Sequence, residues 1–453
     1  MEQQLDTQIG AWRSAILKSR AVTEADADEL EEHLREQITE LEGTGLNGDE
    51  AFLIAVGRLG KVDAVTAEFA REHSDRLWKQ LATSRPDEGG TRSLVLVIGL
   101  AVLAAALVQT ARVLAGQPGP AQFLGEPTAP WFARDLSLFV LPVLAAYFAV
   151  VRRMPWQRTV WLAAVVAVLA IAVNVFPFAD DSATGVLVGI HLPVALWFVV
   201  GAAYVGGEVR SSTKRMDFIR FTGEWAIYYA LIALGGAVLL GLTTLVLEPI
   251  APDALEDVIT WVLPSGAAGA VLVAAWLVEA KKSVVENLAP VLTAIFTPLF
   301  AAMLLASATV YAIAGVGRDF DRNLLTVFDV LLLVVLGLIV YGISARDSSR
   351  RAGLMDVIRL VAVVAAIVLD VLVLVSMFAR IGEFGFTANR VAALGLNLIL
   401  LVNLAGTAWF IGRLLAGRGS AVRLERWQTD YLPVFAAWVV VVLLALPPIF
   451  GFA

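Results

Sequence analysis

Residues 353–378 read GLMDVIRLVAVVAAIVLDVLVLVSMF, and this stretch decides the class of fold. An α-helix rises about 1.5 Å per residue, so about 20 apolar residues are enough to cross the hydrocarbon core of a bilayer. The stretch reaches that length, is largely aliphatic, and contains Arg359 and Asp370. It therefore predicts a membrane-spanning helix that carries ionisable groups.

Ten further stretches have the same character. Hydrophobic residues make up 58% of the chain and charged residues 17%, and the mean hydropathy is +0.77. A soluble core cannot cover so much apolar surface, whereas a bilayer can. We therefore predict an all-α, polytopic helical membrane protein with about eleven spans. The spans are expected near residues 94–115, 136–151, 157–176, 184–204, 222–247, 258–279, 288–315, 323–343, 353–378, 388–412 and 430–449.

The charges that flank the predicted spans indicate the orientation. The flanks on the same side as the N-terminus carry 20 Lys and Arg residues, and the opposite flanks carry six. Flanks rich in Lys and Arg remain in the cytoplasm. The chain is thus expected in the inner (plasma) membrane, with a cytoplasmic N-terminus and, after an odd number of spans, an external C-terminal Ala453.

An acidic segment precedes the spans. Residues 1–90 contain 19 Asp and Glu residues against 10 Lys and Arg residues, a balance that argues against nucleic-acid binding. Thr23 begins a capping-box pattern, and apolar residues then recur on one helical face at Leu30, Leu34, Ile38 and Leu41. We predict a small cytoplasmic helical domain over residues 1–83.

Two more helices are expected in this domain, near residues 47–60 and 62–81. A linker with Pro and Gly residues follows at 84–93, and residues 94–453 form the transmembrane domain.

Within the head, Gly45-Leu46, Glu50-Ala51, Ala55 and Leu59-Gly60 resemble the permease-prefix and HAAS-type domains. These helical modules precede the membrane parts of many bacterial proteins. The resemblance implies that the head regulates or assembles the membrane part and that residues 1–83 contact a cytoplasmic protein partner. In some relatives the module accompanies PadR-type regulators.

A second resemblance lies in residues 380–390, RIGEFGFTANR, with the apolar helix that follows. They look like a signature of uncharacterised bacterial families of many-span proteins. The resemblance implies fold and topology and brings no activity. The two glycines at 382 and 385 predict a tight external turn, and Glu383 is expected to pair with Arg380 or Arg390.

The sequence offers little for enzymatic chemistry. The chain has no cysteine and three histidines, and it contains no nucleotide-binding loop, zinc-protease motif or nucleophile elbow. We therefore predict that the protein is not an enzyme and that it uses neither a cofactor nor a metal.

Three ionisable residues within the predicted spans are the main functional candidates. An ionisable group inside a bilayer costs several kcal/mol, so each needs a partner or a function. His191, Asp329 and Asp370 all fall roughly 9–15 Å below the predicted outer surface. Polar residues at similar depth join them as ligand- or ion-binding candidates: Asn397, Ser307 and Thr309.

These residues support a transport-like hypothesis. Prolines 193 and 298 each free a backbone carbonyl near the candidates, as in the interrupted helices of transporters. The hypothesis is a water-accessible cavity in the outer half of the bundle that binds a cation, a proton or a small polar solute, regulated by the head. The alternative for the acids is that each simply fixes helix packing. The alternative for the protein is a membrane sensor that relays the state of the envelope to a cytoplasmic partner such as a transcriptional regulator.

Other features of the spans predict packing. Arg359 stands eleven residues before Asp370, about three turns, so both should face the same way. Gly185 and Gly189, and a second set at 235, 236 and 241, predict close contacts between helices. Glu224 and Glu279 are expected in solvated ion pairs at the cytoplasmic interface. The sequence names neither the substrate nor the oligomeric state.

Overall fold

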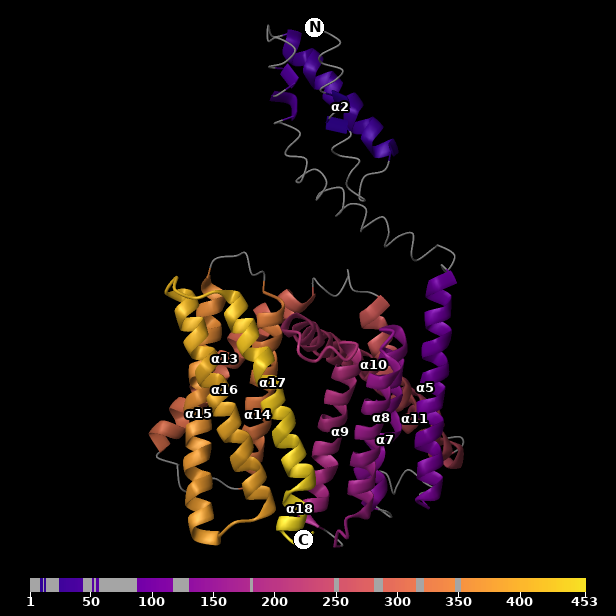
Figure 1. Ribbon diagram of the computed structural model, residues 1–453, viewed down its shortest axis with the longest axis vertical. Helices are drawn as coiled ribbons and strands as arrows, with labels where there is room; N and C mark the ends of the chain where they lie inside the picture. The colour runs from indigo at the N-terminus through magenta and orange to yellow at the C-terminus, as the bar shows by residue number, and fades with distance from the viewer. Residues whose placement is uncertain are drawn as a thin grey trace. The chain divides into compact units, whose positions relative to one another are not determined.

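A computed structural model of the chain describes residues 9–10, 12–13, 24–43, 51–52, 54–56, 88–116, 130–179, 182–247, 252–280, 288–314, 322–346 and 352–453. These residues lie in helices and short turns, and none of them is in a β-strand. They belong to two compact units, Met1–Thr91 and Arg92–Ala453 (Figure 1).

The principal helix of the first unit is α2 (Glu24–Gly43). It confirms the helix predicted to follow Thr23 and to end at a glycine. Its predicted apolar face is buried at Leu34, Ile38 and Leu41. The side chain of Leu30, the predicted helix over 62–81 and most of the predicted linker lie outside the described residues.

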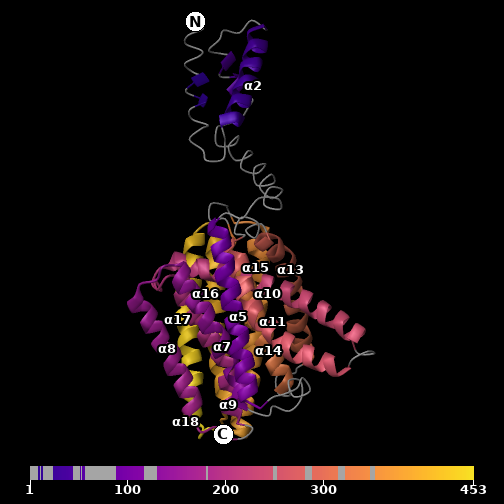
Figure 2. The same ribbon diagram turned by 90° about the vertical axis from the view of Figure 1, so that its right-hand side faces the viewer.

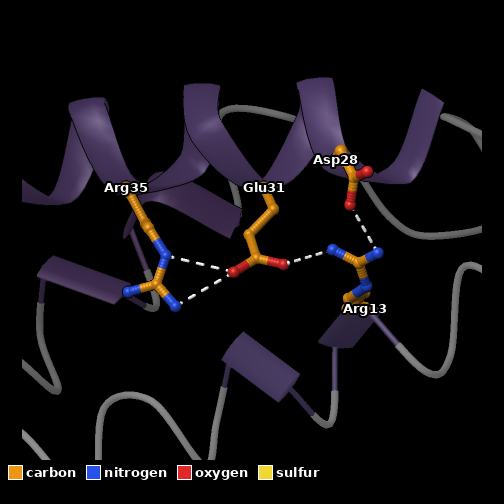
Figure 3. A network of polar contacts seen from close by, with 4 residues as sticks. All are labelled: Arg13, Asp28, Glu31 and Arg35. Atoms are coloured by element: carbon orange, nitrogen blue, oxygen red, sulfur yellow. Dashed lines mark hydrogen bonds and ion pairs between the residues drawn. The ribbon is translucent and has the colours of Figure 1, made fainter. Parts of the chain in front are cut away.

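An ion network ties the beginning of the chain to α2 (Figure 3). Arg13 forms an ion pair with Asp28, and its Nη1 donates to Glu31 Oε2 over 2.7 Å. Arg35 donates from Nε and Nη2 to Glu31 Oε1 over 3.1 and 3.0 Å. The hydrogen bond from Arg13 lowers the pKa of Glu31 below its ordinary value, against a smaller opposing effect of burial.

The second unit is a bundle of long helices. Among the described residues, 11 helices are long and apolar enough to cross a membrane, which gives the chain the architecture of a multi-pass membrane protein. They are α5 (Glu88–Leu114), α7 (Pro130–Val151), α8 (Trp156–Val175), α9 (Ala183–Tyr204), α10 (Ser212–Leu247), α11 (Pro252–Ala280), α13 (Leu288–Ala314), α14 (Arg322–Ser344), α15 (Leu354–Phe384), α16 (Ala388–Leu415) and α17 (Ala421–Leu444). A short α18 (Leu446–Ile449) follows.

The helices form two lobes, each around its own apolar core (Figures 1 and 2). The first lobe comprises α5 and α7 to α11, and the second comprises α13 to α16. Helix α17 packs on α9 of the first lobe and on α16 of the second. It contains Pro433, so the Thr429 carbonyl one turn earlier lacks its usual helical donor.

We name the two ends of the bundle by their charge. The basic end is where α5, α8, α10, α13, α15 and α17 begin, and the far end is where they finish. The described residues of the more positively charged flanks, among them Arg152, Arg215 and Arg413, lie toward the basic end. In Figure 1 this is the end at which α5 starts.

Two helices begin well before their predicted spans, at the basic end. Helix α10 begins at Ser212 rather than 222, and α17 at Ala421 rather than 430. The polar early turns of these two helices are joined by hydrogen bonds and an ion pair. Ser212 Oγ lies 2.7 Å from Thr429 Oγ1, and Arg215 pairs with Asp430. Hydropathy alone cannot detect helical turns that are stabilised by polar partners.

The glycine contacts differ between the two predicted sites. A Cβ added to Gly189 would lie 3.5 Å from Arg134 Cα, which confirms a close contact between α9 and α7. A Cβ at Gly235, Gly236 or Gly241 would meet nothing within 4 Å, so the predicted helix contact there is wrong. This part of α10 leans out of the bundle together with α11 (Figure 2), and its leucines are exposed.

The connection between α15 and α16 is a turn at one glycine rather than two. Gly385 has φ +75°, whereas Gly382 lies inside the last turn of α15. The Nη1 of Arg390 donates to the carbonyls of Phe384 and Gly385 over 3.0 and 2.7 Å, so Arg390 fixes the turn through backbone oxygens instead of through Glu383.

Candidate functional site

Three of the six predicted site residues meet inside the second lobe. Asn397 of α16 donates from Nδ2 to Asp329 Oδ1 of α14 over 2.8 Å. Asp370 is the second carboxyl group of this region and lies on α15, which packs on both α14 and α16. We call these three residues, Asp329, Asp370 and Asn397, the carboxyl cluster.

Asp370 is the most isolated member of the carboxyl cluster. Its side chain is 0% exposed, and neither carboxyl oxygen has a hydrogen-bond donor among the described residues. Asn397 Oδ1 also lacks a partner there, while its Nδ2 bonds Ala393 O over 2.9 Å as well as Asp329. Core residues Leu369 and Val373 flank Asp370 along the chain.

The surroundings of Asp370 determine whether its carboxyl group can be ionised or must be protonated. An ionised carboxylate without donors, removed from water, costs several kcal/mol even after relaxation. Asp329 adds a second acid beside it instead of a cation. The Asp370 carboxyl group is therefore expected to carry a proton in this packing, and to lose it only when a donor, a cation or water reaches it.

Among the described residues, no hydrogen bond joins the other three predicted residues to the carboxyl cluster. His191 is on α9 in the first lobe, where Nδ1 donates to the carbonyl of Leu187 over 2.8 Å. Thr309 is exposed and its hydroxyl donates to Leu305 O over 2.7 Å, within its own helix. Ser307 is half-buried on the same helix, α13. Similar depth in the membrane thus did not imply proximity.

Arg359 belongs to a separate buried ion network at the basic end. Its Nη1 lies 3.2 Å from Asp356 Oδ1, and Arg346 Nε lies 3.2 Å from the same oxygen. The N–H of Gly353 donates to Asp356 Oδ2 over 3.1 Å, so Asp356 also caps α15. Arg359 lies eleven residues from Asp370, about 16 Å along the helix, and is not its counter-charge.

The first lobe contains a cavity at its basic end, with a volume of about 710 Å³. We call it the basic pocket. Its walls come from the α7–α8 turn, the end of α9, the start of α10 and the end of α11. Five cationic residues and three acidic residues line it: Arg152, Arg153, Arg158, Lys214, Arg220, Glu208, Asp217 and Glu224.

Most of these cations are held in place by the protein. Arg152 forms two 2.9 Å hydrogen bonds with Glu279 and lies 4.7 Å from the ring centre of Tyr204. Arg158 donates to the carbonyl of Gly206 over 3.2 Å. Lys214 pairs with Glu208 over 2.8 Å and lowers the pKa of that carboxyl group. The protein itself therefore fixes the positions of these cations around the pocket. The sequence indicated only that these arginines flank the spans and set the membrane orientation.

A second cavity of about 640 Å³ lies further along the same helices. We call it the apolar groove. Its lining is mostly aliphatic and aromatic, including Trp197, Trp225 and Tyr229, with contributions from α5, α7, α9, α10 and α11. The indole nitrogens donate within the protein, Trp197 to Thr222 Oγ1 over 3.2 Å and Trp225 to Val271 O over 3.1 Å. The indole N–H groups thus already have partners, and the groove is predominantly hydrocarbon.

A stack of aromatic rings lies between the two cavities. Tyr204 and Phe221 line the basic pocket, with ring centres 4.7 Å apart. Phe221 lies 6.3 Å from Trp197, which lines the apolar groove and lies 4.4 Å from Trp225. A single layer of buried rings along α9 and α10 therefore separates the cationic cavity from the apolar one.

Neither cavity is lined by Asp329 or Asp370. Within the described segments, no group of three or more His, Asp or Glu side chains is arranged to hold a metal ion. In comparisons with protein-family models, curated proteins and solved structures, nothing matches this chain.

Proposed function

We propose that the protein is a transport-type membrane protein in which the carboxyl cluster binds the coupling proton. The observation that carries the proposal is Asp370, fully buried and without a hydrogen-bond donor among the described residues. Such a residue adds no packing bond and costs free energy in a bilayer. Ionisable residues of this kind mark ion pathways and proton relays.

The two acids differ in access, which suggests the order of proton transfer. Asp329 is partly exposed and lies seven residues from the far-end start of α14, about 10 Å along the helix. Asp370 is sealed. A proton arriving from the far end reaches Asp329 first, and it passes to Asp370 when a movement of the helices or a water molecule links the two carboxyl groups, which make no hydrogen bond to each other in this structure. Asn397 keeps Asp329 oriented for that step.

The proton-binding part of the proposal has a direct spectroscopic test. Purified protein in lipid nanodiscs is titrated with pH, and the carboxylic C=O stretching band is followed by infrared difference spectroscopy. The wild type should lose a buried carboxylic band as the pH rises, and Asp370→Asn should lack that band throughout. Asp430→Asn, at an exposed acid of α17, is the matched control and should behave like the wild type. Identical spectra for the wild type and Asp370→Asn would exclude proton binding at Asp370.

The transport part is tested separately in proteoliposomes with a pH-sensitive dye inside. Amino acids, sugars and small organic anions are added outside one at a time. A transporter should show solute-dependent proton movement that Asp370→Asn abolishes and Asp430→Asn retains.

A membrane sensor is the second candidate, and one observation favours it. Because neither cavity reaches Asp370, the carboxyl cluster can instead stabilise one of two bundle conformations, whose change the head passes to a cytoplasmic partner. In that case the infrared band titrates, but no added solute moves protons.

A further inference from the structure

The basic pocket and the apolar groove carry an inference beyond the proposed function, because they lie in the other lobe from the carboxyl cluster. We propose that the first lobe binds an anionic phospholipid, with the phosphate headgroup in the basic pocket and an acyl chain along the apolar groove.

Charge complementarity supports the headgroup position. The five cationic side chains of the pocket exceed its three acidic ones. Arg153 is exposed, and although its backbone N–H donates to Val150 O over 3.1 Å, its guanidinium group makes no hydrogen bond or ion pair with any described residue and is available. Arg158 uses one nitrogen for Gly206 and keeps its other donors. Guanidinium groups with unused donors suit the paired oxygens of a phosphate.

The backbone holds Arg153 at the rim of the pocket. It has φ +49°, in the left-handed region that side-chain-bearing residues rarely adopt. The turn is fixed by the N–H of Met154, which donates to Ala149 O over 2.9 Å, and by Met154 itself, which is buried. The cation is thus presented by a constrained turn rather than by a solvated loop.

The spacing of the two cavities matches a lipid. On α9, Trp197 of the groove and Tyr204 of the pocket are seven residues apart, about 10 Å along the helix. On the α7 side the groove runs from Leu141 to Arg134, which are eleven and eighteen residues from Arg152, about 16 and 27 Å along the helix. One leaflet contributes half of the hydrocarbon core, about 15 Å. A headgroup in the pocket therefore brings the end of an acyl chain of the same molecule to the near part of the groove, at Trp197 and Leu141.

The position of the pocket also fits the membrane. It lies at the basic end, where the predicted orientation puts the cytoplasmic leaflet. Basic pockets between spanning helices at that level bind phosphate-bearing headgroups. A soluble phosphate compound would use the pocket but leave the groove without a ligand.

The test uses phospholipid with brominated acyl chains, which quenches nearby tryptophan fluorescence. The delipidated full-length protein is titrated with brominated phosphatidylglycerol and, separately, with brominated phosphatidylcholine. We expect saturable quenching by the first lipid at concentrations at least roughly tenfold lower than by the second. Most of this saturable quenching should be lost in the double variant Trp197→Phe with Trp225→Phe, because both rings line the groove.

Three variants locate the site. Arg153→Gln with Arg158→Gln should weaken phosphatidylglycerol binding roughly tenfold or more, the effect of losing one charge-assisted contact. Ala267→Phe, which fills the groove from an exposed position, should weaken it without touching the charges. Arg418→Gln, an exposed arginine at the same end but outside the pocket, should have no effect.

Several outcomes would overturn the proposal. Equal binding of both lipids would show that charge plays no role, and unchanged binding in the double Arg variant would exclude the pocket. Competition by glycerol 3-phosphate as strong as by phosphatidylglycerol would identify a soluble ligand instead. Asp370→Asn should leave lipid binding unchanged, so this test and the proton test fail independently.

Discussion

Asp370→Leu should make the protein more stable, although it removes an ionisable residue from the centre of α15. Leucine has the same branching at Cγ as aspartate, and the carboxyl oxygens that it replaces have no donor among the described residues. Removing an unsatisfied buried polar group recovers about 1–3 kcal/mol. The larger methyl groups cost less than about 1.5 kcal/mol if the volume is roughly conserved. The net expectation is a gain of about 1 kcal/mol.

The matched control lies on the same helix. Asp356 is also buried, at 6% exposure, but it pairs with Arg346 and Arg359 and caps the helix. Removing one partner of a buried ion network costs about 3–5 kcal/mol. Asp356→Leu should therefore destabilise the protein by that amount.

Both variants can be compared with the wild type by unfolding in mixed micelles with increasing sodium dodecyl sulfate, followed by tryptophan fluorescence. The reasoning predicts opposite shifts of the midpoint for the two aspartates. If Asp370→Leu lowers stability by as much as Asp356→Leu, then Asp370 makes bonds that hold the fold, and the functional interpretation of the carboxyl cluster fails.

Three further predictions concern the head and the helix contacts. Hydrogen bonds lower the pKa of Glu31 in the folded head. Its ionised carboxylate should therefore stabilise the head fully at pH values above the pKa of the unfolded chain, about 4.3, and this stabilisation should be lost as the pH falls through the lower pKa of the folded head. Hydrogen exchange of α2 in the full chain should thus be faster in Glu31→Gln than in the wild type near neutral pH and converge with it in acid; a constant difference would contradict this. Gln109 donates over 2.9 Å to Trp261 O and over 2.8 Å to Ser265 Oγ, beside the turn of α11 in which Pro264 provides no N–H donor. Gln109→Leu should therefore lower the free energy of unfolding in the micelle assay by about 1–3 kcal/mol. A Cβ on Gly395 would overlap the ring of Trp438, whereas one on Gly412 would meet nothing within 4 Å; Gly395→Ala should lower the unfolding midpoint and Gly412→Ala should not.

Hydropathy predicted the eleven spans because each is long and apolar enough to be recognised alone. It missed the first turns of α10 and α17, since their stability depends on polar partners such as Ser212 and Thr429 that come from distant parts of the chain. Counting residues from a span's end likewise gives the depth of a side chain but not the helix face or the lobe.

The same limitation explains the candidate site. Asp329, Asp370 and Asn397 were chosen because burying them is costly, and the fold brings them together. His191 has a similar depth but lies in the first lobe, where a backbone carbonyl satisfies it. The basic pocket was missed because its arginines come from separate turns and had already been explained by membrane orientation.

The proline in α17 has a mechanical consequence. This helix bridges both halves of the bundle, and at Pro433 its internal ladder is interrupted one turn above the polar contacts that anchor it to α10 and α16. The segment beyond the proline packs on both neighbours, since the Trp438 ring lies against Gly395 of α16 and Leu443 belongs to the apolar core of the first lobe. A change of the bend at Pro433 would therefore be transmitted to both halves of the bundle at the far end at once.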